Sequence, residues 1–268
     1  MLLAIDIGNT ETVLGIYRGK RLSAHGRFSS TSHRTADECR LLFRLWAGEK
    51  RVALPAIRGA VISSVVPSLT ALFARAVKEA AGVESLVVDS DTDTGLVIRY
   101  DSPRAVGADR ICNAVAGFAR YGGPVVVVDF GTATTFDVVS GSGEYLGGAI
   151  TLGVKHQAVE LHRVAAKLPK VDLVFPEAVV GRTTESSMQS GLMWGTVAMI
   201  DGMIERIASE NGWSRRLAVV ATGGLAQRME GKSKRIQAIE PFLTLEGMRI
   251  IYERVGRSGR KGGRHDRT

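Results

Sequence analysis

Two apolar runs in this chain end in the same polar pattern. Residues 2–5 lead into Asp6-Ile7-Gly8-Asn9-Thr10, and residues 125–128 lead into Asp129-Phe130-Gly131-Thr132-Ala133-Thr134-Thr135. Short apolar runs that close in a glycine turn predict buried strands. Each is followed by two further strand-like runs, so the pattern indicates one structural unit that occurs in both halves of the chain.

The first half predicts three strands followed by helices that alternate with strands. The strands span residues 2–7, 12–17 and 21–29. Thr35-Ala36-Asp37-Glu38 has the capping-box pattern and predicts the start of a helix. Its apolar face is expected at Leu41, Leu42, Leu45 and Trp46. Further predictions are a strand at 60–62, a helix from Pro67, a strand at 86–88 and a helix over 103–121.

The second half repeats this order after Gly122-Gly123-Pro124, a break that sets the expected domain boundary. It predicts strands at 125–129, 134–139 and 145–150, a helix at 154–167, an irregular segment at 169–183, a helix at 185–210, a strand at 217–221 and a helix at 245–253. The fold class is therefore α/β, with a mixed sheet and flanking helices in each domain. The expected domains are 1–121 and 122–253.

Net charge is uneven along the chain. The 268 residues carry a formal charge of +8, and from Arg254 onward six basic residues face one acid. Glycine is frequent there and an apolar face is missing, so residues 254–268 are expected to form a disordered basic tail. The pattern favours a solubilising role over nucleic-acid binding.

Cysteine content and hydropathy narrow the class of protein. The two cysteines, Cys39 and Cys112, fall in segments that predict helices, which favours two buried thiols over a disulfide framework. We therefore expect a cytoplasmic protein. Residues 192–204, the most apolar run, are interrupted by Gly195, Asp201 and Gly202, so no membrane span is predicted.

The two glycine turns have the chemistry of phosphate binding. Glycine lets the backbone approach a ligand, and backbone N–H groups and threonine hydroxyls bind phosphate oxygens. An aspartate at the strand end is placed to hold a cation, directly or through water. A single Asp-x-Gly-x-Thr phrase is more often an ordinary turn. Two copies at equivalent places favour a pair of loops that bind a nucleoside triphosphate and its metal.

A second candidate group lies between these turns in the sequence. Gly107-Ala108-Asp109-Arg110 falls within the predicted helix that ends at Tyr121, and Arg99-Tyr100-Asp101 precedes it. An aspartate can accept the proton of an attacking hydroxyl, and an arginine can pair with a substrate carboxylate. From composition alone, a solvated helix face is the favoured interpretation of these charges.

A set of motifs resembles the type III pantothenate kinase family from the N-terminus to about Arg254. The matching stretches, in order, are Asp6-Ile7-Gly8-Asn9-Thr10, Arg34-Thr35-Ala36-Asp37-Glu38, Asp93-Thr94-Gly95, Gly107-Ala108-Asp109-Arg110, the turn from Asp129 to Thr135, Met188-Gln189-Ser190-Gly191 and Thr222-Gly223-Gly224. The resemblance implies two duplicated ribonuclease H-like domains of the actin/Hsp70/sugar-kinase type. It also implies ATP-dependent phosphorylation of pantothenate to 4'-phosphopantothenate, the first step of coenzyme A biosynthesis.

The resemblance also assigns site residues. It implies that Asp109 is the catalytic proton acceptor, that Asp129 binds a monovalent cation (K⁺ or NH₄⁺) and that Asp6 holds Mg²⁺ through water. The implied ATP-binding residues are Asp6, Ile7, Gly8, Asn9, Thr10, Glu11, Thr12, Val13, Thr132, Gly223 and Gly224. The implied pantothenate-binding residues are Tyr100, Gly107, Ala108, Asp109, Arg110 and Thr184.

Thr184 is implied to reach the site of a partner chain across a homodimer interface. The helix expected from Glu185 carries Met188, Leu192, Met193 and Met199, which would supply the apolar face of that interface. An ordinary core helix is the commoner explanation of such a pattern.

The chain departs from the family pattern in two places. Thr183-Thr184 stands where the family usually has Asn-Thr, and Thr151-Leu152-Gly153 with Lys155-His156-Gln157 replaces a Pro-Gly step and a small hydroxyl residue. Two other functions fit the same fold: a non-catalytic nucleotide-binding factor that supports transcription, and a kinase for another small hydroxylated acid. The presence of Asp6, Asp109 and Asp129 favours an enzyme, since a pure binder needs no proton acceptor.

Overall fold

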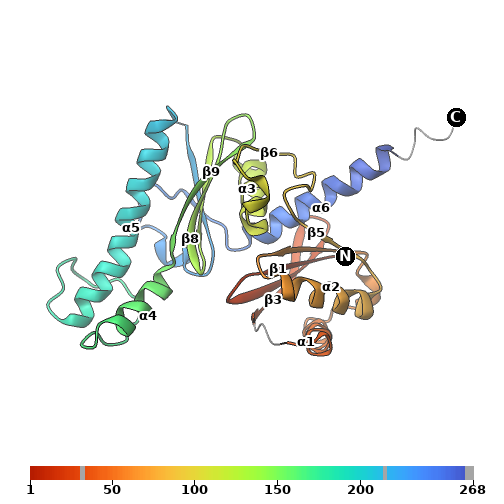
Figure 1. Ribbon diagram of the computed structural model, residues 1–268, viewed down its shortest axis with the longest axis horizontal. Helices are drawn as coiled ribbons and strands as arrows, with labels where there is room; N and C mark the ends of the chain where they lie inside the picture. The colour runs from red at the N-terminus through yellow and green to blue at the C-terminus, as the bar shows by residue number, and fades with distance from the viewer. Residues whose placement is uncertain (31–33, 214–215, 263–268) are drawn as a thin grey trace. The chain divides into compact units, whose positions relative to one another are not determined.

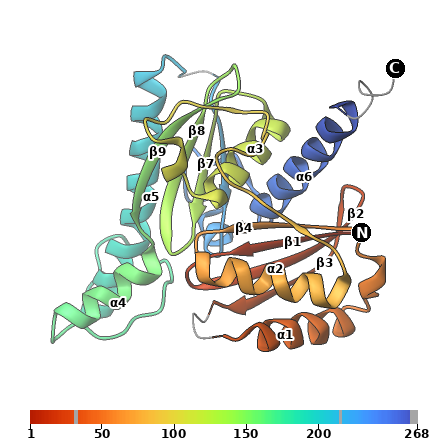
Figure 2. The same cartoon turned by 45° about the vertical axis from the view of Figure 1, so that its right-hand side comes forward.

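The structure, a computed structural model, describes residues 1–30, 34–213 and 216–262. The chain forms two compact units (Figures 1 and 2). One comprises Met1–Ala119 together with the segment that begins at Leu243, and the other comprises Arg120–Phe242. Each unit contains its own sheet, hydrophobic core and one of the two glycine turns.

The first unit is built on a sheet in the order β3-β2-β1-β4-β5. Its strands are β1 (Leu2–Ile7), β2 (Glu11–Arg18), β3 (Arg21–Ser29), β4 (Gly59–Ser64) and β5 (Ser85–Val87). β1 pairs antiparallel with β2 and parallel with β4. The predicted three-strand meander is confirmed, and it places β1 at the centre of the sheet.

Helices cover both faces of this sheet. The helices of the unit are α1 (Ala36–Glu49), α2 (Pro67–Ala81), α3 (Ala108–Tyr121, whose last two residues fall in the second unit) and α6 (Leu243–Gly262). Three shorter elements are η1 (Leu54–Ala56), β6 (Val97–Ile98) and η2 (Pro103–Ala105). Figure 2 shows α1 and α2 together on one face, where they bury Leu3, Ile5 and Ile7 of β1. α6 packs on the other face, against β1 and β4.

The start of α1 is as predicted, but of its predicted apolar face only Trp46 is fully in the core. The Thr35 hydroxyl accepts a hydrogen bond from the Glu38 N–H (3.2 Å), and the Thr35 N–H donates to the Glu38 carboxylate (2.7 Å). The side chains that enter the core are Cys39, Phe43, Trp46 and Ala47. Leu41 and Leu45 are 58% and 63% exposed. Burial depends on which face of the helix a residue occupies, because the face that packs on the sheet contains positions 39, 43, 46 and 47.

The second unit repeats the strand order of the first. Five of its strands lie in the order β9-β8-β7-β10-β11. They are β7 (Val125–Phe130), β8 (Ala133–Val139), β9 (Glu144–Leu152), β10 (Ala218–Thr222) and β11 (Ala238–Ile239). β7 pairs antiparallel with β8 and parallel with β10, as β1 pairs with β2 and β4. The predicted duplication is therefore confirmed at the level of topology.

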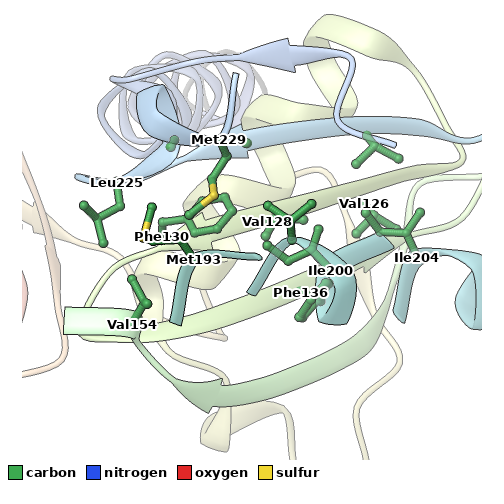
Figure 3. Close-up of a cluster of buried hydrophobic side chains, with 14 of the residues drawn as sticks. Val126, Val128, Phe130, Phe136, Val154, Met193, Ile200, Ile204, Leu225 and Met229 are labelled. Atoms are coloured by element: carbon green, nitrogen blue, oxygen red, sulfur yellow. The ribbon is translucent and has the colours of Figure 1, made fainter. Parts of the chain in front are cut away.

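A long helix covers one face of the second sheet. The unit contains α4 (Val154–Val164), α5 (Thr184–Glu210) and the short η3 (Ala226–Met229). Figure 3 shows Met193, Ile200 and Ile204 of α5 packed with Val128 and Phe136 of the sheet. Met188, Leu192 and Met193 are 7%, 3% and 0% exposed. Of the two explanations considered for these side chains, the ordinary core helix is confirmed for Leu192 and Met193, which lie in the core of their own unit.

The C-terminal region also differs from the prediction. α6 spans Leu243–Gly262 and clusters with the first unit, whereas the sequence placed a helix at 245–253 in the second domain and a disordered tail from Arg254. That tail is helical as far as Gly262, and residues 263–268 lie outside the described residues. The helix forms because Leu245, Met248 and Ile251 recur at helical spacing and are each buried.

Other expectations of the sequence analysis agree with the structure. Cys39 and Cys112 are free and buried. Within the described ranges, every helix is too short or too polar to cross a bilayer.

Candidate active site

The first glycine turn follows β1 and is closed by its own backbone. The Gly8 N–H donates to the Glu11 carbonyl (3.0 Å), which leaves Asn9 and Thr10 exposed at the tip. Asp6 lies one residue before the end of β1 and pairs in register with Ser63 of β4. The Ser63 hydroxyl donates to the Asp6 carboxylate (3.0 Å), so the parallel neighbour fixes this side chain.

Only part of the predicted ATP-binding segment presents side chains at the turn. Ile7 is fully buried in the core of the first unit. The Thr12 hydroxyl is buried and bonded to the Ser30 hydroxyl (2.8 Å), and Glu11 pairs with Arg27 (2.6 Å). These side chains stabilise the hairpin, and the backbone of Gly8 with the tip residues remains as the surface that a phosphate would meet.

Asp109 lies in the first turn of α3. The predicted helix start at Pro103 is wrong: residues 103–105 form a separate short helix, and α3 begins at Ala108. A Cβ on Gly107 would lie 2.5 Å from the Asp109 Oδ1, so glycine leaves room for this carboxylate. The helix N-terminus is a favourable place for a negative charge. The Arg110 N–H donates to the Asp109 Oδ1 (2.8 Å).

Burial raises the pKa of Asp109, while the Arg110 N–H and the charge of Arg110 oppose that rise. Arg110 is itself only 7% exposed. A partly buried carboxylate with a raised pKa is a stronger base than one in water, so this residue has the properties of a proton acceptor.

Cys112 lies close to the two candidate aspartates of the first unit, Asp6 and Asp109. Burial raises the pKa of the Cys112 thiol, and the negative charges of Asp6 and Asp109 raise it further, while a hydrogen bond with Ser63 lowers it. The fold thus gathers Asp6, Ser63, Asp109 and Cys112 in one place. Sequence reasoning missed Ser63 and Cys112; the available signal was the serine pair that ends the buried strand at 60–62.

The remaining predicted substrate residues of this unit flank α3. Tyr100 is partly buried and follows β6 closely, and Ala108 is buried at the first position of α3. The neighbouring Arg99 and Asp101 are exposed. Tyr100 therefore belongs to an irregular segment whose position depends on the loops on either side of it.

The second glycine turn has the same construction in the other unit. Asp129 lies one residue before the end of β7 and pairs in register with Thr222 of β10. The Gly131 N–H donates to the Ala133 carbonyl (3.0 Å), and the exposed Thr132 accepts at its carbonyl from the Gly153 N–H (3.0 Å).

Gly223 follows β10 directly and contacts the turn. It has φ +90°, and a Cβ there would lie 2.3 Å from the Asp129 Oδ1. The sequence grouped Gly223 and Gly224 with the adenosine; the structure shows that Gly223 also contacts the predicted cation ligand. Within the described residues no three His, Cys, Asp or Glu side chains cluster to bind a metal ion.

Comparisons with known proteins show the family of the chain. The family model of the type III pantothenate kinases matches residues 2–206. Type III pantothenate kinases from Moorella thermoacetica and Geobacter sulfurreducens are each 47% identical over 254 residues, which cover 95% of this chain and 99% of the relative.

The chain belongs to the type III pantothenate kinase family.

Solved structures show the same fold. A Campylobacter jejuni protein assigned to the Baf family of transcriptional activators has a TM-score of 0.61 at 19% identity, with 95% of this chain and 99% of that chain covered. A Sinorhizobium meliloti protein assigned as a 2-dehydro-3-deoxygalactonokinase has a TM-score of 0.55 at 13% identity, with 96% of each chain covered. At such identities the likeness shows the fold alone, and the expected sugar-kinase-like fold is confirmed.

The departure from the family pattern at Thr183 has a structural explanation. Thr183 is the N-cap of α5, and its hydroxyl accepts from the Ser186 N–H (3.1 Å). Threonine and asparagine both cap helices, so the replacement preserves the start of α5. The following Thr184 is exposed.

The second departure lies on α4. Lys155 is exposed and His156 is partly buried in the first turn of the helix, directly after the contact between Gly153 and Thr132. Among the described residues the Nδ1 of His156 has no hydrogen-bond partner. These two side chains therefore change the polarity of the segment next to the second turn.

We predict that Gly223→Ala lowers the free energy of unfolding by about 1–3 kcal/mol, the usual cost of a strained backbone conformation. The reason is the positive φ and the clash with Asp129. Chemical denaturation measures the change. Gly195→Ala, at an exposed glycine of α5 with open space around it, is the matched control and should be neutral or stabilising. Equal stability of the Gly223→Ala chain and the parent would contradict the close contact.

Proposed function

We propose that this chain transfers the γ-phosphoryl group of ATP to the hydroxyl of pantothenate and releases 4'-phosphopantothenate and ADP. The observation that carries the proposal is Asp109: a partly buried carboxylate with a raised pKa, in a chain of this kinase family. The reaction is the first step of coenzyme A synthesis.

Asp109 acts as the proton acceptor in this proposal. The pantothenate hydroxyl oxygen attacks the γ-phosphorus, the bond to the β–γ bridging oxygen breaks, and the hydroxyl proton passes to the Asp109 carboxylate. Arg110 pairs with the carboxylate of pantothenate, and Tyr100, Gly107 and Ala108 contact the rest of that substrate. Phosphoryl transfer is mostly a matter of positioning and charge stabilisation, so the base supplies a modest part of the rate.

ATP is bound by both glycine turns. The backbone of Gly8 with Asn9 and Thr10 contacts the phosphates from the first unit, and Thr132 contacts them from the second. Support comes from the exposure of these side chains and from the closed backbone turns at both places. Ile7, Glu11, Thr12 and Val13 shape the first turn, and Gly223 with Gly224 lies beside the adenosine.

Two cations complete the proposal. Mg²⁺ accompanies ATP and is held by Asp6 through water, and a monovalent cation, K⁺ or NH₄⁺, is held by Asp129. A single carboxylate at a strand end, next to the Gly223 backbone, fits an ion that prefers oxygen ligands. When bound, these ions neutralise charge on the phosphates.

A homodimer shares the pantothenate site. Support comes from apolar side chains that remain exposed on β9, α4 and the segment after α4: Ile150, Leu152, Val159, Val164, Val179 and Val180. Exposed apolar groups in such numbers are typical of a surface that another protein covers. These residues replace the α5 methionines as the expected interface, and the exposed Thr184 is proposed to reach the partner's site.

We predict that Asp109→Asn lowers kcat for ATP and pantothenate by roughly 10²-fold, the low end of the range for a general base. A coupled assay of ADP release measures it. Asp101→Asn, which removes an exposed carboxylate of the same segment, is the control and should leave kcat unchanged. Near-normal turnover by Asp109→Asn would reject the assignment, and a parent enzyme that leaves pantothenate unphosphorylated would reject the function.

The same variant should not be less stable at neutral pH. The folded state raises the pKa of Asp109, so it binds a proton more tightly than the unfolded chain. Stability therefore falls as pH rises from the unfolded pKa through the folded one. Asparagine removes this loss, so Asp109→Asn should melt at the same temperature as the parent or higher at pH 8.

We predict that K⁺ activates the enzyme through Asp129. Activity should rise steeply when K⁺ replaces tetramethylammonium at equal ionic strength, because only the small ion reaches the carboxylate. Asp129→Ala should lose this response while it keeps its melting temperature. Equal rates of the parent enzyme in both salts would remove the monovalent ion from the mechanism.

We predict that two inactive chains complement each other if the site is shared. Thr184→Arg and Asp109→Asn should each be nearly inactive alone. After subunit exchange they should regain activity, because one of the two sites in the mixed dimer then carries neither change. Light scattering and a tagged pull-down verify the mixed dimer. Failure to recover despite confirmed exchange would contradict a shared site.

A further inference from the structure

α6 is an integral part of the first unit. Leu245, Met248 and Ile251 are buried, and Arg249 is only 4% exposed. The Arg249 guanidinium binds Glu246 and Glu253 at 2.6 Å each and lies over the Tyr17 ring, 5.9 Å from its centroid. The buried apolar side chains and the contact of Arg249 with Tyr17 fix the rotation of the helix about its own axis, and with it the direction of the residues that follow.

The same helix is held against α3, which carries Asp109. A Cβ on Gly247 would lie 1.9 Å from the Cys112 carbonyl oxygen, so the two helix backbones touch at this point. One turn away, the Thr244 hydroxyl donates to the Asn113 side-chain oxygen (2.8 Å). Any shift of α6 along its axis would therefore be resisted at α3.

The C-terminal part of α6 binds a loop of the same unit. The Arg254 Nε donates to the Asp93 Oδ1 (2.6 Å), and the Ser258 hydroxyl donates to the Asp93 Oδ2 (3.1 Å). The hydrogen bond from Arg254 is the main cause that lowers the pKa of Asp93, and the bond from Ser258 lowers it further. Both carboxylate oxygens of Asp93 are thus occupied by one helix.

The Arg254 guanidinium also lies over the loop backbone. Gly95 has φ +82°, and a Cβ there would lie 2.9 Å from the Arg254 Nη1. Between Asp93 and Gly95, Thr94 is only 6% exposed. Each of these three residues has its own structural role. Asp93 binds the helix, Thr94 is buried, and Gly95 leaves room for the guanidinium over the backbone.

This loop leads directly to the proposed substrate segment. Gly95 is followed by Leu96, the two residues of β6, and then Arg99 and Tyr100. Before Asp93 the loop is closed locally, since the Asp89 carboxylate accepts from the Thr92 hydroxyl (2.7 Å). The contact with α6 therefore attaches this loop to the rest of its unit a few residues before Tyr100.

We propose that Arg254 and Ser258 are positioning residues for pantothenate: through Asp93 they hold the loop at residues 93–95 and so set the place of Tyr100. The inference rests on the proposed function for its substrate. The family model matches residues 2–206, a range that does not include α6. The residues expected to be a dispensable tail thus include two that act on the substrate segment.

If the Arg254–Asp93 ion pair only stabilised the fold, its loss would have different effects from those that the proposal expects. The Arg254 and Asp93 side chains are 50% and 45% exposed, and ion pairs this exposed contribute little to global stability. The proposal therefore expects that loss of the pair changes the affinity for pantothenate with little change in melting temperature. A purely structural role would leave both quantities unchanged, or would lower stability and worsen every kinetic constant together.

The experiment compares Arg254→Gln with Arg257→Gln, which removes an exposed cation of the same helix. We expect Arg254→Gln to raise KM for pantothenate roughly 3- to 10-fold, well below the roughly 100-fold cost of a 1 Å misplacement of reacting groups. KM for ATP and the melting temperature should stay unchanged, and Arg257→Gln should match the parent. An unchanged KM for pantothenate in Arg254→Gln would overturn the proposal.

A charge exchange tests the pair itself. Asp93→Arg and Arg254→Asp should each raise KM for pantothenate, and the double variant should recover at least half of the loss, because it restores the attraction. Ser258→Ala should give a smaller rise. Additive defects in the double variant would contradict a direct role of the contact.

Hydrogen exchange separates this proposal from the proposed function. Amides of residues 93–100 should exchange faster in Arg254→Gln than in the parent, with Arg257→Gln unchanged, whatever the substrate is. Faster exchange in a protein that does not phosphorylate pantothenate would support the attachment and reject the function. Equal exchange rates in the parent, Arg254→Gln and Arg257→Gln would reject the proposal that α6 holds this loop, and would leave the proposed function unaffected.

Discussion

Each unit is organised around one strand that is buried on both faces. Leu3, Ala4, Ile5 and Ile7 of β1 are fully buried, and so are the four valines of β7. A strand of this kind requires neighbours on both sides and helices above and below it. The first polar side chain must then fall at the strand end, which is where Asp6 and Asp129 stand. The remaining features of the candidate site follow from this constraint.

The parallel neighbour of each central strand supplies the surroundings of its aspartate. Ser63 pairs with Asp6 and bonds its carboxylate, and Thr222 pairs with Asp129 just before Gly223. Carboxyl ends of parallel strands meet at one edge of a sheet, the edge where α/β proteins bind their ligands. A single topology, used twice, therefore gives the Asp-apolar-Gly pattern the same place at the end of both central strands.

The first unit adds the proposed proton acceptor, Asp109, to its turn. Asp109 comes from a helix rather than a strand, and the negative charges of Asp6 and Asp109 both raise the pKa of Cys112. Burial raises the pKa of Asp109 itself, which suits a group that must take a proton during the reaction. Arg110, beside Asp109 and almost fully buried, supplies the compensating positive charge.

α6 shows how a distant part of the chain serves this arrangement. It packs on the first sheet, touches the α3 backbone at Cys112 and binds the loop at Asp93. Buried helix packing of this sort is stiff, because protein interiors are close-packed and resist small shifts. One helix can therefore hold both Asp109 and the segment that leads to Tyr100.

The sequence by itself determined the duplicated strand order, the two glycine turns with Asp6 and Asp129, and the capped start of α1 at Thr35. These features are local: they depend on alternation, chain-turn chemistry and caps within a few residues. The family motifs added the kinase activity and the role proposed for Asp109. The expected start of its helix at Pro103 failed, because a short separate turn precedes α3.

Only the tertiary structure decided which face of α1 is buried, that Ser63 and Cys112 lie with Asp6 and Asp109, and that α6 belongs to the first unit. It also decided that Leu192 and Met193 of α5 belong to the core of their own unit. Each outcome depends on contacts between residues far apart in the chain. A helix with apolar residues on several sides has no local signal that tells which side its sheet will cover, and a basic, glycine-rich segment becomes helical where a partner such as Asp93 is held in place by the rest of the fold.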